Sequence, residues 1–231
     1  MKKTEEICVI IQARLGSQRV PEKMIKPFAD TTLSDIALDK ILGCSAFPRE
    51  QFYFSAWEPE LREIANRKGL NVFPRSEASA KSEGTPMTEM YEWWNKVPFK
   101  YAILVNGCTP FLKPETIDSF FEAYKNSPSD GMFGVIEKKN YFWNKDGEIL
   151  TPLTEAVMNT KTVTKTYEAA HCLYAGRLDK IGQGVWMGDF MIPGDIELFP
   201  MHEKEVLDID YSWQFDMCES LWNEWSKKGL V

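Results

Sequence analysis

Strand-like and helix-like segments alternate along the first 137 residues, and this alternation is the strongest constraint on the fold. Runs rich in β-branched and aromatic residues recur at 7–13, 51–56, 70–74, 101–106 and 131–137. Helical patterns separate them at 33–43, 58–68, 86–96 and 114–126. Such alternation predicts an α/β fold, in which a mostly parallel central sheet carries helices on both faces.

The first apolar run stops abruptly in a small basic loop. Between residues 14 and 26 the chain has four basic residues and one acidic residue, although its overall net charge is −7. Gly16 and Ser17 let the backbone approach an anion closely and offer N–H donors. Arg14, Arg19 and Lys23 can neutralise that anion. An ordinary solvated connection is the alternative, but cations clustered directly after a central strand favour a site for a polyphosphate.

Composition excludes several classes of protein. The 231 residues, 44% of them hydrophobic, suit a single domain over 1–231. The five cysteines are scattered and only two histidines are present, which argues against a disulfide framework and a zinc site. A negative net charge with one basic loop argues against nucleic acid as a partner. Since no stretch resembles a signal peptide or a membrane span, we expect a cytoplasmic protein.

The alternation breaks between residues 138 and 192. We expect an insertion there, with a hairpin at 141–150 around a turn at 144–147 and a further strand at 168–175. Apolar and aromatic residues crowd this segment, which suits packing or a subunit interface. After it, residues 211–227 show the apolar spacing of a core-facing helix.

Two carboxylates lie near the end of the chain. Asp208 and Asp210 flank Ile209 in a segment that we expect to end a strand, so that both carboxylates point the same way. Two carboxylates on one edge of a sheet suit Mg²⁺, which also takes substrate phosphates as ligands. The alternative is that Asp210 only caps the following helix.

The motif at residues 12–23 reads Gln-Ala-Arg-Leu-Gly-Ser-Gln-Arg-Val-Pro-Glu-Lys. It resembles the A-R-x-G-S-x-R-x-P-x-K signature of the acylneuraminate (sialic-acid-type) cytidylyltransferases, and especially their spore-coat polysaccharide biosynthesis protein F-like branch. The segment around Asp208 and Asp210 resembles the D-I-D-x-x-x-D ending of that family, with Gln214 where a further Asp is usual. Residues 105–111 resemble the middle motif L-Q-P-T-S-P-L more loosely.

The resemblance implies a Rossmann-like nucleotidyltransferase fold, related to that of GT-A glycosyltransferases. It also implies an enzyme that uses CTP, with Mg²⁺, to activate an acidic sugar as a CMP-sugar with release of pyrophosphate, for surface polysaccharide or glycan biosynthesis. Members are typically homodimers that exchange an arm, here residues 138–192. The sequence does not identify the sugar.

The resemblance also assigns roles to individual residues. Arg14, Lys23 and Asp210 are the expected catalytic residues, and the metal ligands are Asp208 and Asp210. The residues expected to bind the nucleotide are Ala13, Arg14, Leu15, Gly16, Ser17, Arg19, Lys23, Arg75 and Asn106. Those expected to bind the acceptor sugar are Asn106, Thr109, His171 and Tyr174.

Three alternatives stay open at this stage. One is another nucleotidyltransferase that uses a different base or a non-sugar acceptor. A nucleotide-sugar glycosyltransferase of related fold would also use an Asp-x-Asp motif, although that motif normally lies in the middle of the chain. A non-catalytic nucleotide-binding homologue is the third alternative, because the segments near the expected sugar site match the family loosely.

Overall fold

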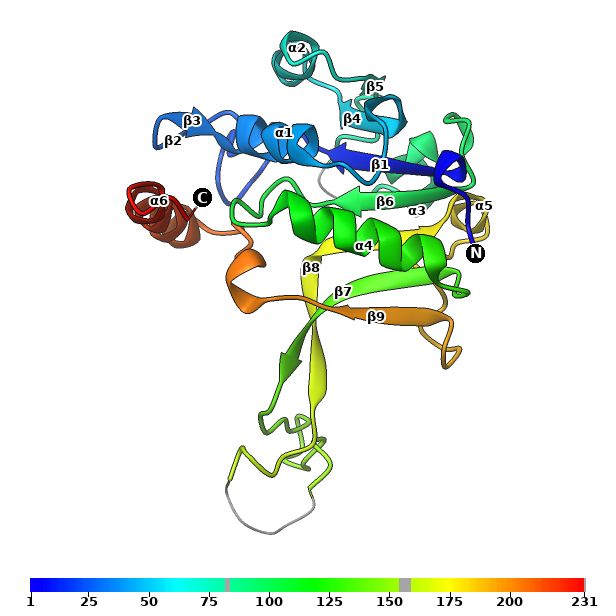
Figure 1. The fold of residues 1–231 in the computed structure, drawn as a ribbon, viewed down its shortest axis with the longest axis vertical. Helices are drawn as coiled ribbons and strands as arrows, with labels where there is room; N and C mark the ends of the chain where they lie inside the picture. Colours follow the sequence, from blue (N-terminus) through cyan, green and yellow to red (C-terminus); the bar gives the residue numbers. More distant parts are fainter. Residues whose placement is uncertain (82–83, 154–158, 231) are drawn as a thin grey trace.

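A computed structural model describes residues 1–81, 84–153 and 159–230. Seven strands form a sheet of order β5-β4-β1-β6-β8-β7-β9 (Figure 1). The strands are β1 Ile7–Gln12, β4 Phe52–Ala56, β5 Val72–Pro74, β6 Tyr101–Val105, β7 Gly131–Lys138, β8 Thr166–Arg177 and β9 Ile196–Pro200. Neighbours are parallel except that β8 runs antiparallel to β6 and β7. The predicted mostly parallel sheet is confirmed.

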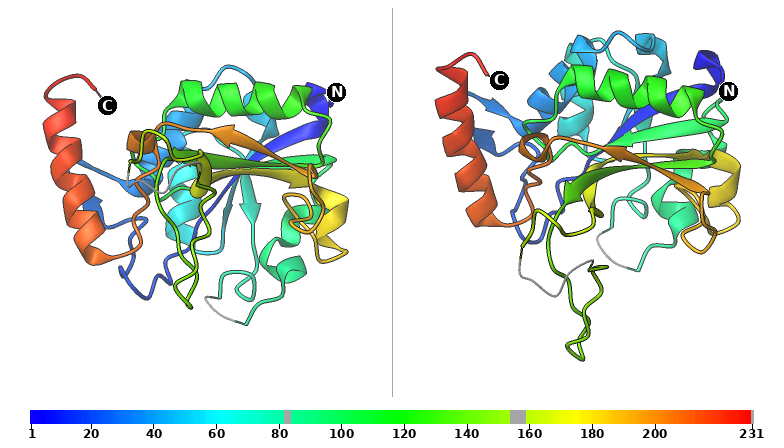
Figure 2. Two further views of the ribbon diagram at one scale, coloured as in Figure 1. Left: turned by 90° about the horizontal axis from the view of Figure 1, so that it is seen from below. Right: turned by 60° about the horizontal axis from the view of Figure 1, so that its bottom comes forward.

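Helices cover both faces of this sheet. The longer ones are α1 Leu33–Gly43, α2 Pro59–Arg67, α4 Pro114–Asn126 and α6 Ser212–Ser226. The short ones are α3 Met87–Met90, α5 Leu178–Ile181 and the 3₁₀ turns η1 Thr4–Glu6, η2 Arg49–Gln51, η3 Glu92–Asn95 and η4 Glu203–Glu205. Figure 2 shows α4 on one face, with α3 and α5 on the other. A parallel sheet is thereby buried on both sides.

Alternation along β1 places its side chains in two cores. Ile7, Val9 and Ile11 pack in the larger cluster, with residues of α1, α2 and α4. Cys8 and Ile10 point the other way, into a smaller cluster with η3 and α5. All five side chains are fully buried, as expected for a central strand.

Local signals explain where several helices begin and end. The Thr32 side chain accepts the N–H of Asp35 at 3.1 Å and caps α1. Gly69 follows the end of α2, and its φ of +67° lies in the left-handed region that favours glycine. Pro114 takes the first position of α4. The predicted helix starts at residues 33 and 114 are confirmed, and α2 lies within one residue of the predicted range 58–68 at each end.

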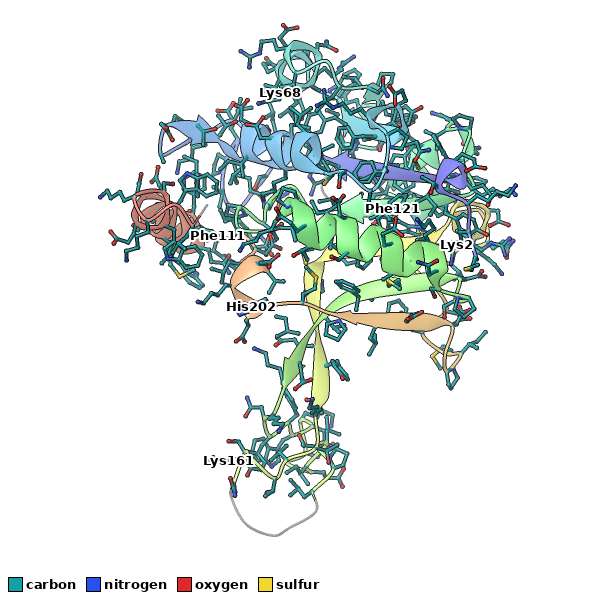
Figure 3. The ribbon with its side chains drawn as sticks, viewed as in Figure 1. Lys2, Lys68, Phe111, Phe121, Lys161 and His202 are labelled. Atoms are coloured by element: carbon teal, nitrogen blue, oxygen red, sulfur yellow. The ribbon has the colours of Figure 1, made fainter. Side chains whose placement is uncertain are left out.

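Some elements differ from the prediction. The pattern at 86–96 does not form one helix, because the chain breaks between α3 and the 3₁₀ turn η3. The short hairpin of β2 Pro27–Phe28 and β3 Thr31–Thr32, and the edge strand β9, were not predicted. Both are covered by aromatic contacts, since Phe28 packs on α6 and Phe199 packs on α4. Phe111 also lies beside α6 (Figure 3).

The segment expected as an insertion is divided between the sheet and an arm. Within it, β8 lies inside the sheet, whereas residues 139–153 and 159–165, between β7 and β8, stand away from the body (Figure 1). Lys161 lies in the outer part of this arm (Figure 3). The expected hairpin forms, closed by a bridge between Trp143 and Ile149. Within the described residues, no helix is both long and apolar enough to span a membrane.

Candidate active site

The basic loop follows β1 at the carboxyl edge of the parallel strands, and three contacts fix its backbone. The Ala13 N–H donates to the carbonyl of Ser55 in β4 at 2.9 Å, and the Leu15 N–H donates to Oε1 of Glu58 at 2.7 Å. Arg75 Nη1 donates to the carbonyl of Ala13 at 3.2 Å. These bonds hold the loop open toward the edge where open α/β sheets bind ligands.

Arg75 lies under the loop instead of facing a ligand. Its side chain is 3% exposed, and its guanidinium also donates to the side chain and carbonyl of Ser79. Burial lowers the pKa of Arg75 to about 10, with a further contribution from the charge of Arg14. Arg75 was predicted to bind the nucleotide; in the structure it anchors the backbone of the loop that would do so.

A cavity of about 390 Å³ opens above this loop, and we call it the loop cavity. It is lined by Gln12, Ala13, Arg14, Ser17, Gln18, Arg19, Lys23, Met24, Cys108 and Asp210. The lining contains three cations and one carboxylate, in a chain that is acidic overall. Such a concave cluster of positive charge on a fixed backbone suits a polyphosphate.

The three cations are held in different ways. Arg14 Nη1 donates to the carbonyls of Ala80, at 3.4 Å, and Lys81. Because these partners are neutral, the charge of Arg14 remains available to an anion. Arg19 pairs with Asp210 at 2.7 Å, while Lys23 Nζ donates to the carbonyl of Ile209 at 2.6 Å and lies 3.6 Å from Asp210 Oδ1.

Asp208 and Asp210 lie beside this cavity. The sequence predicted that the segment carrying them ends a strand, but in the structure this segment is not a strand. Its place is fixed by the Ile209 N–H, which donates to the carbonyl of Cys108 at 3.1 Å, and by the complete burial of Ile209. The two aspartates flank this buried residue. The local chain is therefore held by single contacts and not by a β-ladder.

Asp210 does not cap helix α6. Gln214 Oε1 accepts the N–H groups of Asp210, at 2.7 Å, and Tyr211, at 2.8 Å, so the amide performs the capping. The interpretation of Asp210 as a helix cap is therefore wrong. Its carboxylate instead faces Arg19 and Lys23.

The carboxylate of Asp208 is partly buried. Burial raises its pKa, and the nearby charge of Asp210 raises it further, while Lys23 acts in the opposite direction. Among the described residues Oδ1 of Asp208 has no hydrogen-bond partner. A buried, unpaired carboxylate oxygen beside a second carboxylate fits a hard divalent cation such as Mg²⁺. In the described part of the chain no cluster of three His, Cys, Asp or Glu side chains adds further ligands.

A second cavity of about 470 Å³ lies beside the first, and we call it the aromatic cavity. It is lined by Gln12, Tyr91, Leu104, Val105, Asn106, Phe133, His171, Tyr174, Trp186, Met187 and Phe190. Ring contacts hold its walls, with centroids 4.8 Å apart for Tyr91 and Trp186 and 4.9 Å apart for Phe133 and Tyr174. An apolar cleft with a few polar groups is typical of a site for a small molecule.

Asn106 supplies a polar corner of the aromatic cavity. Its Nδ2 donates to the carbonyl of His171 at 2.8 Å, and its Oδ1 accepts the N–H of Cys108 at 2.8 Å. His171 has φ +53°, close to an irregularity in the pairing of β7 and β8, which turns the strand at this point. Thr109 is completely buried, and its hydroxyl donates to the carbonyl of Asn106 at 2.9 Å. Thr109 therefore helps to fix the backbone of Asn106 from inside the protein.

The structure thus groups most of the predicted site residues at one edge of the sheet. The predicted residues that line the loop cavity are Ala13, Arg14, Ser17, Arg19, Lys23 and Asp210. Asn106, His171 and Tyr174 line the aromatic cavity. Leu15, Gly16, Thr109, Arg75 and Asp208 are not among the lining residues of either cavity. The chemical roles assigned to these residues stay predictions.

Sequence reasoning missed other lining residues. Gln12, Gln18, Met24 and Cys108 in the loop cavity had no role assigned, nor did most of the rings in the aromatic cavity. A polar Gln12 at the end of a fully apolar strand was a usable signal, since such positions normally continue the core pattern.

Comparison with known proteins agrees with this geometry. Residues 8–181 match the family model described as cytidylyltransferase. The spore coat polysaccharide biosynthesis protein SpsF of Bacillus subtilis (strain 168) is 27% identical over 131 residues, 54% of this chain and 52% of that protein. The chain thus matches about half the length of that relative. The pseudaminic acid cytidylyltransferase of Campylobacter jejuni is 21% identical, over 92% of this chain and 94% of that protein.

Solved structures share the fold. The CMP:2-keto-3-deoxy-manno-octonic acid synthetase complexed with CTP matches with a TM-score of 0.68 and 13% identity, over 95% of this chain and 99% of that one. The 4-diphosphocytidyl-2C-methyl-D-erythritol synthase of Anaerococcus prevotii matches with a TM-score of 0.64 and 12% identity, over 94% and 96%. At these identities the likeness concerns the fold alone. The family match over residues 8–181 covers most of the chain, so this protein belongs to the cytidylyltransferase family.

Proposed function

We propose that this protein is a cytidylyltransferase of the acylneuraminate type, which transfers the CMP group of CTP to a hydroxyl of an acidic sugar. The observation that carries the proposal is the pair of adjoining cavities, one lined by Arg14, Arg19 and Lys23 and the other by aromatic rings. The products are a CMP-sugar and pyrophosphate. Relatives whose printed names describe cytidylyltransferases for pseudaminic acid and 3-deoxy-manno-octulosonate support this substrate class.

In the reaction a sugar oxygen forms a bond to the α-phosphorus of CTP, and the bond from that phosphorus to the β-phosphate oxygen breaks. The hydroxyl proton passes to solvent, and pyrophosphate leaves with the bonding electrons. Arg14 and Lys23 neutralise the phosphates and align them, while Arg19 and the Ser17 hydroxyl assist. Positioning and charge neutralisation are therefore the main contributions of the chain.

The proposal includes Mg²⁺, held by Asp208 and Asp210. When bound, this ion would supply positive charge beside the phosphates and the attacking oxygen. Support comes from the unpaired Oδ1 of Asp208 and from the two carboxylates that flank Ile209.

The acceptor sugar takes the aromatic cavity. There Asn106, His171 and Tyr174 contact it, with Thr109 supporting Asn106. We also propose a cytoplasmic homodimer in which the arm reaches a second copy. Exposed apolar side chains on the arm support the dimer, among them Phe142, Trp143, Leu150 and Leu153.

The test is release of pyrophosphate with CTP, Mg²⁺ and a panel of nonulosonic acids, with products identified by mass spectrometry. We expect a CMP-sugar from at least one acid, loss of turnover with EDTA, and a larger rise in Tm with CTP than with ATP or GTP. Transfer from a nucleotide-sugar donor would instead support the glycosyltransferase. CTP binding without pyrophosphate release would indicate a non-catalytic homologue. Light scattering of the purified protein reports the oligomeric state.

A further inference from the structure

Gln12 occupies the junction of the two cavities. Among the described residues it is the one side chain that lines both the loop cavity and the aromatic cavity. It is the last residue of β1, where the central strand reaches the edge that carries the site. A chemical group that is transferred between ligands in the two cavities would therefore pass next to this amide.

The orientation of the Gln12 amide follows from chemistry. Trp93 Nε1 lies 2.8 Å from Gln12 Oε1, and an indole nitrogen can only donate a hydrogen bond. The amide oxygen must therefore face Trp93, which leaves Nε2 with two N–H donors. Among the described residues no group accepts a hydrogen bond from Nε2.

Trp93 is itself immobilised. Its side chain is completely buried, and its ring packs against Tyr91 and Trp186 with centroids 5.4 Å and 5.6 Å away. A fixed indole donor holds the amide in one rotamer before any ligand arrives. Preorganised donors of this kind cost little reorganisation when charge develops next to them.

We propose that Gln12 Nε2 donates a hydrogen bond to a non-bridging oxygen of the α-phosphoryl group during its transfer, which makes Gln12 a catalytic residue. This inference rests on the proposed function, because it needs a nucleotide in the loop cavity and an acceptor in the aromatic cavity. The α-phosphoryl group is the one group bonded to both in the course of the reaction. A neutral donor steadies it without attracting the attacking sugar oxygen away from phosphorus.

The experiment compares Gln12→Met with wild type and with the surface control Gln183→Met. Methionine keeps the length of the side chain but has no donor. We expect kcat to fall roughly 10- to 100-fold in Gln12→Met, with the KM for CTP changed less than about threefold and Tm within about 2 °C. The exposed Gln183→Met should retain wild-type kinetics.

Trp93→Phe tests the orientation of the amide. It keeps Gln12 but removes the donor that holds Oε1, so kcat should fall less than in Gln12→Met. In the double variant the two effects should not add. If Trp93→Phe does not fold, Gln12→Met alone decides.

A second readout does not depend on turnover. In ³¹P spectra of bound CTP, Gln12→Met should shift the α-phosphorus resonance and leave the β and γ resonances in place. Suppose that wild type turns over, and that Gln12→Met has the same kcat and the same α-phosphorus chemical shift as wild type. This result would overturn the role of Gln12 and leave the proposed function standing. If wild type binds CTP but releases no pyrophosphate, the proposed function fails while the spectra still decide the contact. No CTP binding by wild type would overturn both.

Discussion

The two cavities at the edge of the sheet are built in opposite ways. The loop cavity comes mainly from one continuous stretch, residues 12–24, and its lining is charged. The aromatic cavity gathers residues from β1, β6, β7, β8 and three connecting segments, and its lining is mostly apolar. A polyphosphate needs dense positive charge and close backbone donors, which one short loop can supply. Recognition of a sugar-sized molecule needs walls, which only distant segments brought together by the fold can supply.

The two cavities are also stabilised differently. Hydrogen bonds to Ser55 and Glu58, and one from Arg75, fix the backbone of the loop. Ring packing holds the aromatic cavity, in which Trp186 contacts both Tyr91 and Trp93. Substitutions in the loop cavity should therefore change the KM for CTP and kcat. Substitutions in the aromatic cavity should change the KM for the acceptor.

The largest effect on turnover is expected for Asp210→Asn. We expect a loss of kcat of roughly 100-fold or more, because an amide holds a divalent cation poorly and no longer pairs with Arg19 and Lys23. Stability should change little, because Gln214 and not Asp210 caps α6. Pyrophosphate release and Tm are measured in parallel. Asp216→Asn, on the exposed face of the same helix, is the control; full activity of Asp210→Asn would refute the metal assignment.

The next largest effect is expected for Arg14→Ala. Arg14 is bonded to neutral carbonyls, so its charge is free to bind phosphate, and a charge-assisted hydrogen bond of this kind is worth roughly 10- to 100-fold in affinity. The KM for CTP should rise and kcat should fall, while the KM for the acceptor should stay unchanged. Steady-state kinetics with each substrate varied in turn check this. The exposed Arg67→Ala is the matched control, and equal kinetics for the two variants would mean that the loop is only a connection.

The same contrast explains what the sequence could predict. The elements 7–13, 33–43 and 114–126 were recognisable because strand or helix periodicity and their caps agree, and the structure places them as β1, α1 and α4. The loop cavity was recognisable because its lining is local in sequence. In both cases a short window of residues contains the whole physical reason for the structure.

The remaining features depend on contacts between distant residues. The segment with Asp208 and Asp210 was expected to be a strand, but a bond from Ile209 to Cys108 fixes it instead. The pattern at 86–96 breaks after α3, where Trp93 turns inward to meet Gln12 and Trp186. The role of Gln214 becomes visible only once α6 is placed. Periodicity contains no information about such pairings.

The aromatic cavity gives a smaller but selective prediction. Tyr174→Leu removes a ring that packs edge-on against Phe133. Aromatic contacts are worth about 0.5–1.5 kcal/mol beyond burial, so the KM for the acceptor should rise roughly threefold to tenfold. The KM for CTP should stay within about twofold, since Tyr174 does not line the loop cavity. A rise in both constants would show that the cavities do not act separately.

The smallest effect on turnover is expected at Lys40, which lines neither of the two cavities. Its Nζ donates to the carbonyl of Thr109, in the turn that carries Asn106 and Cys108. Burial lowers the pKa of Lys40 to about 7, well below the usual value of a lysine in an unfolded chain. Between those two values the unfolded state binds one more proton than the folded state. The Lys40 contribution to the free energy of unfolding therefore increases as pH rises above about 7.

Denaturant unfolding of wild type and Lys40→Met at pH 6, 7, 8 and 9 tests this linkage. Relative to Lys40→Met, wild type should gain about 1 kcal/mol between pH 7 and pH 8, and little between pH 6 and pH 7. Lys227→Met, at the exposed end of α6, should follow the wild-type profile. If Lys40→Met and wild type keep a constant difference over this range, Lys40 stays charged in the folded protein. The turn between the two cavities would then be held by an ammonium group at every pH tested.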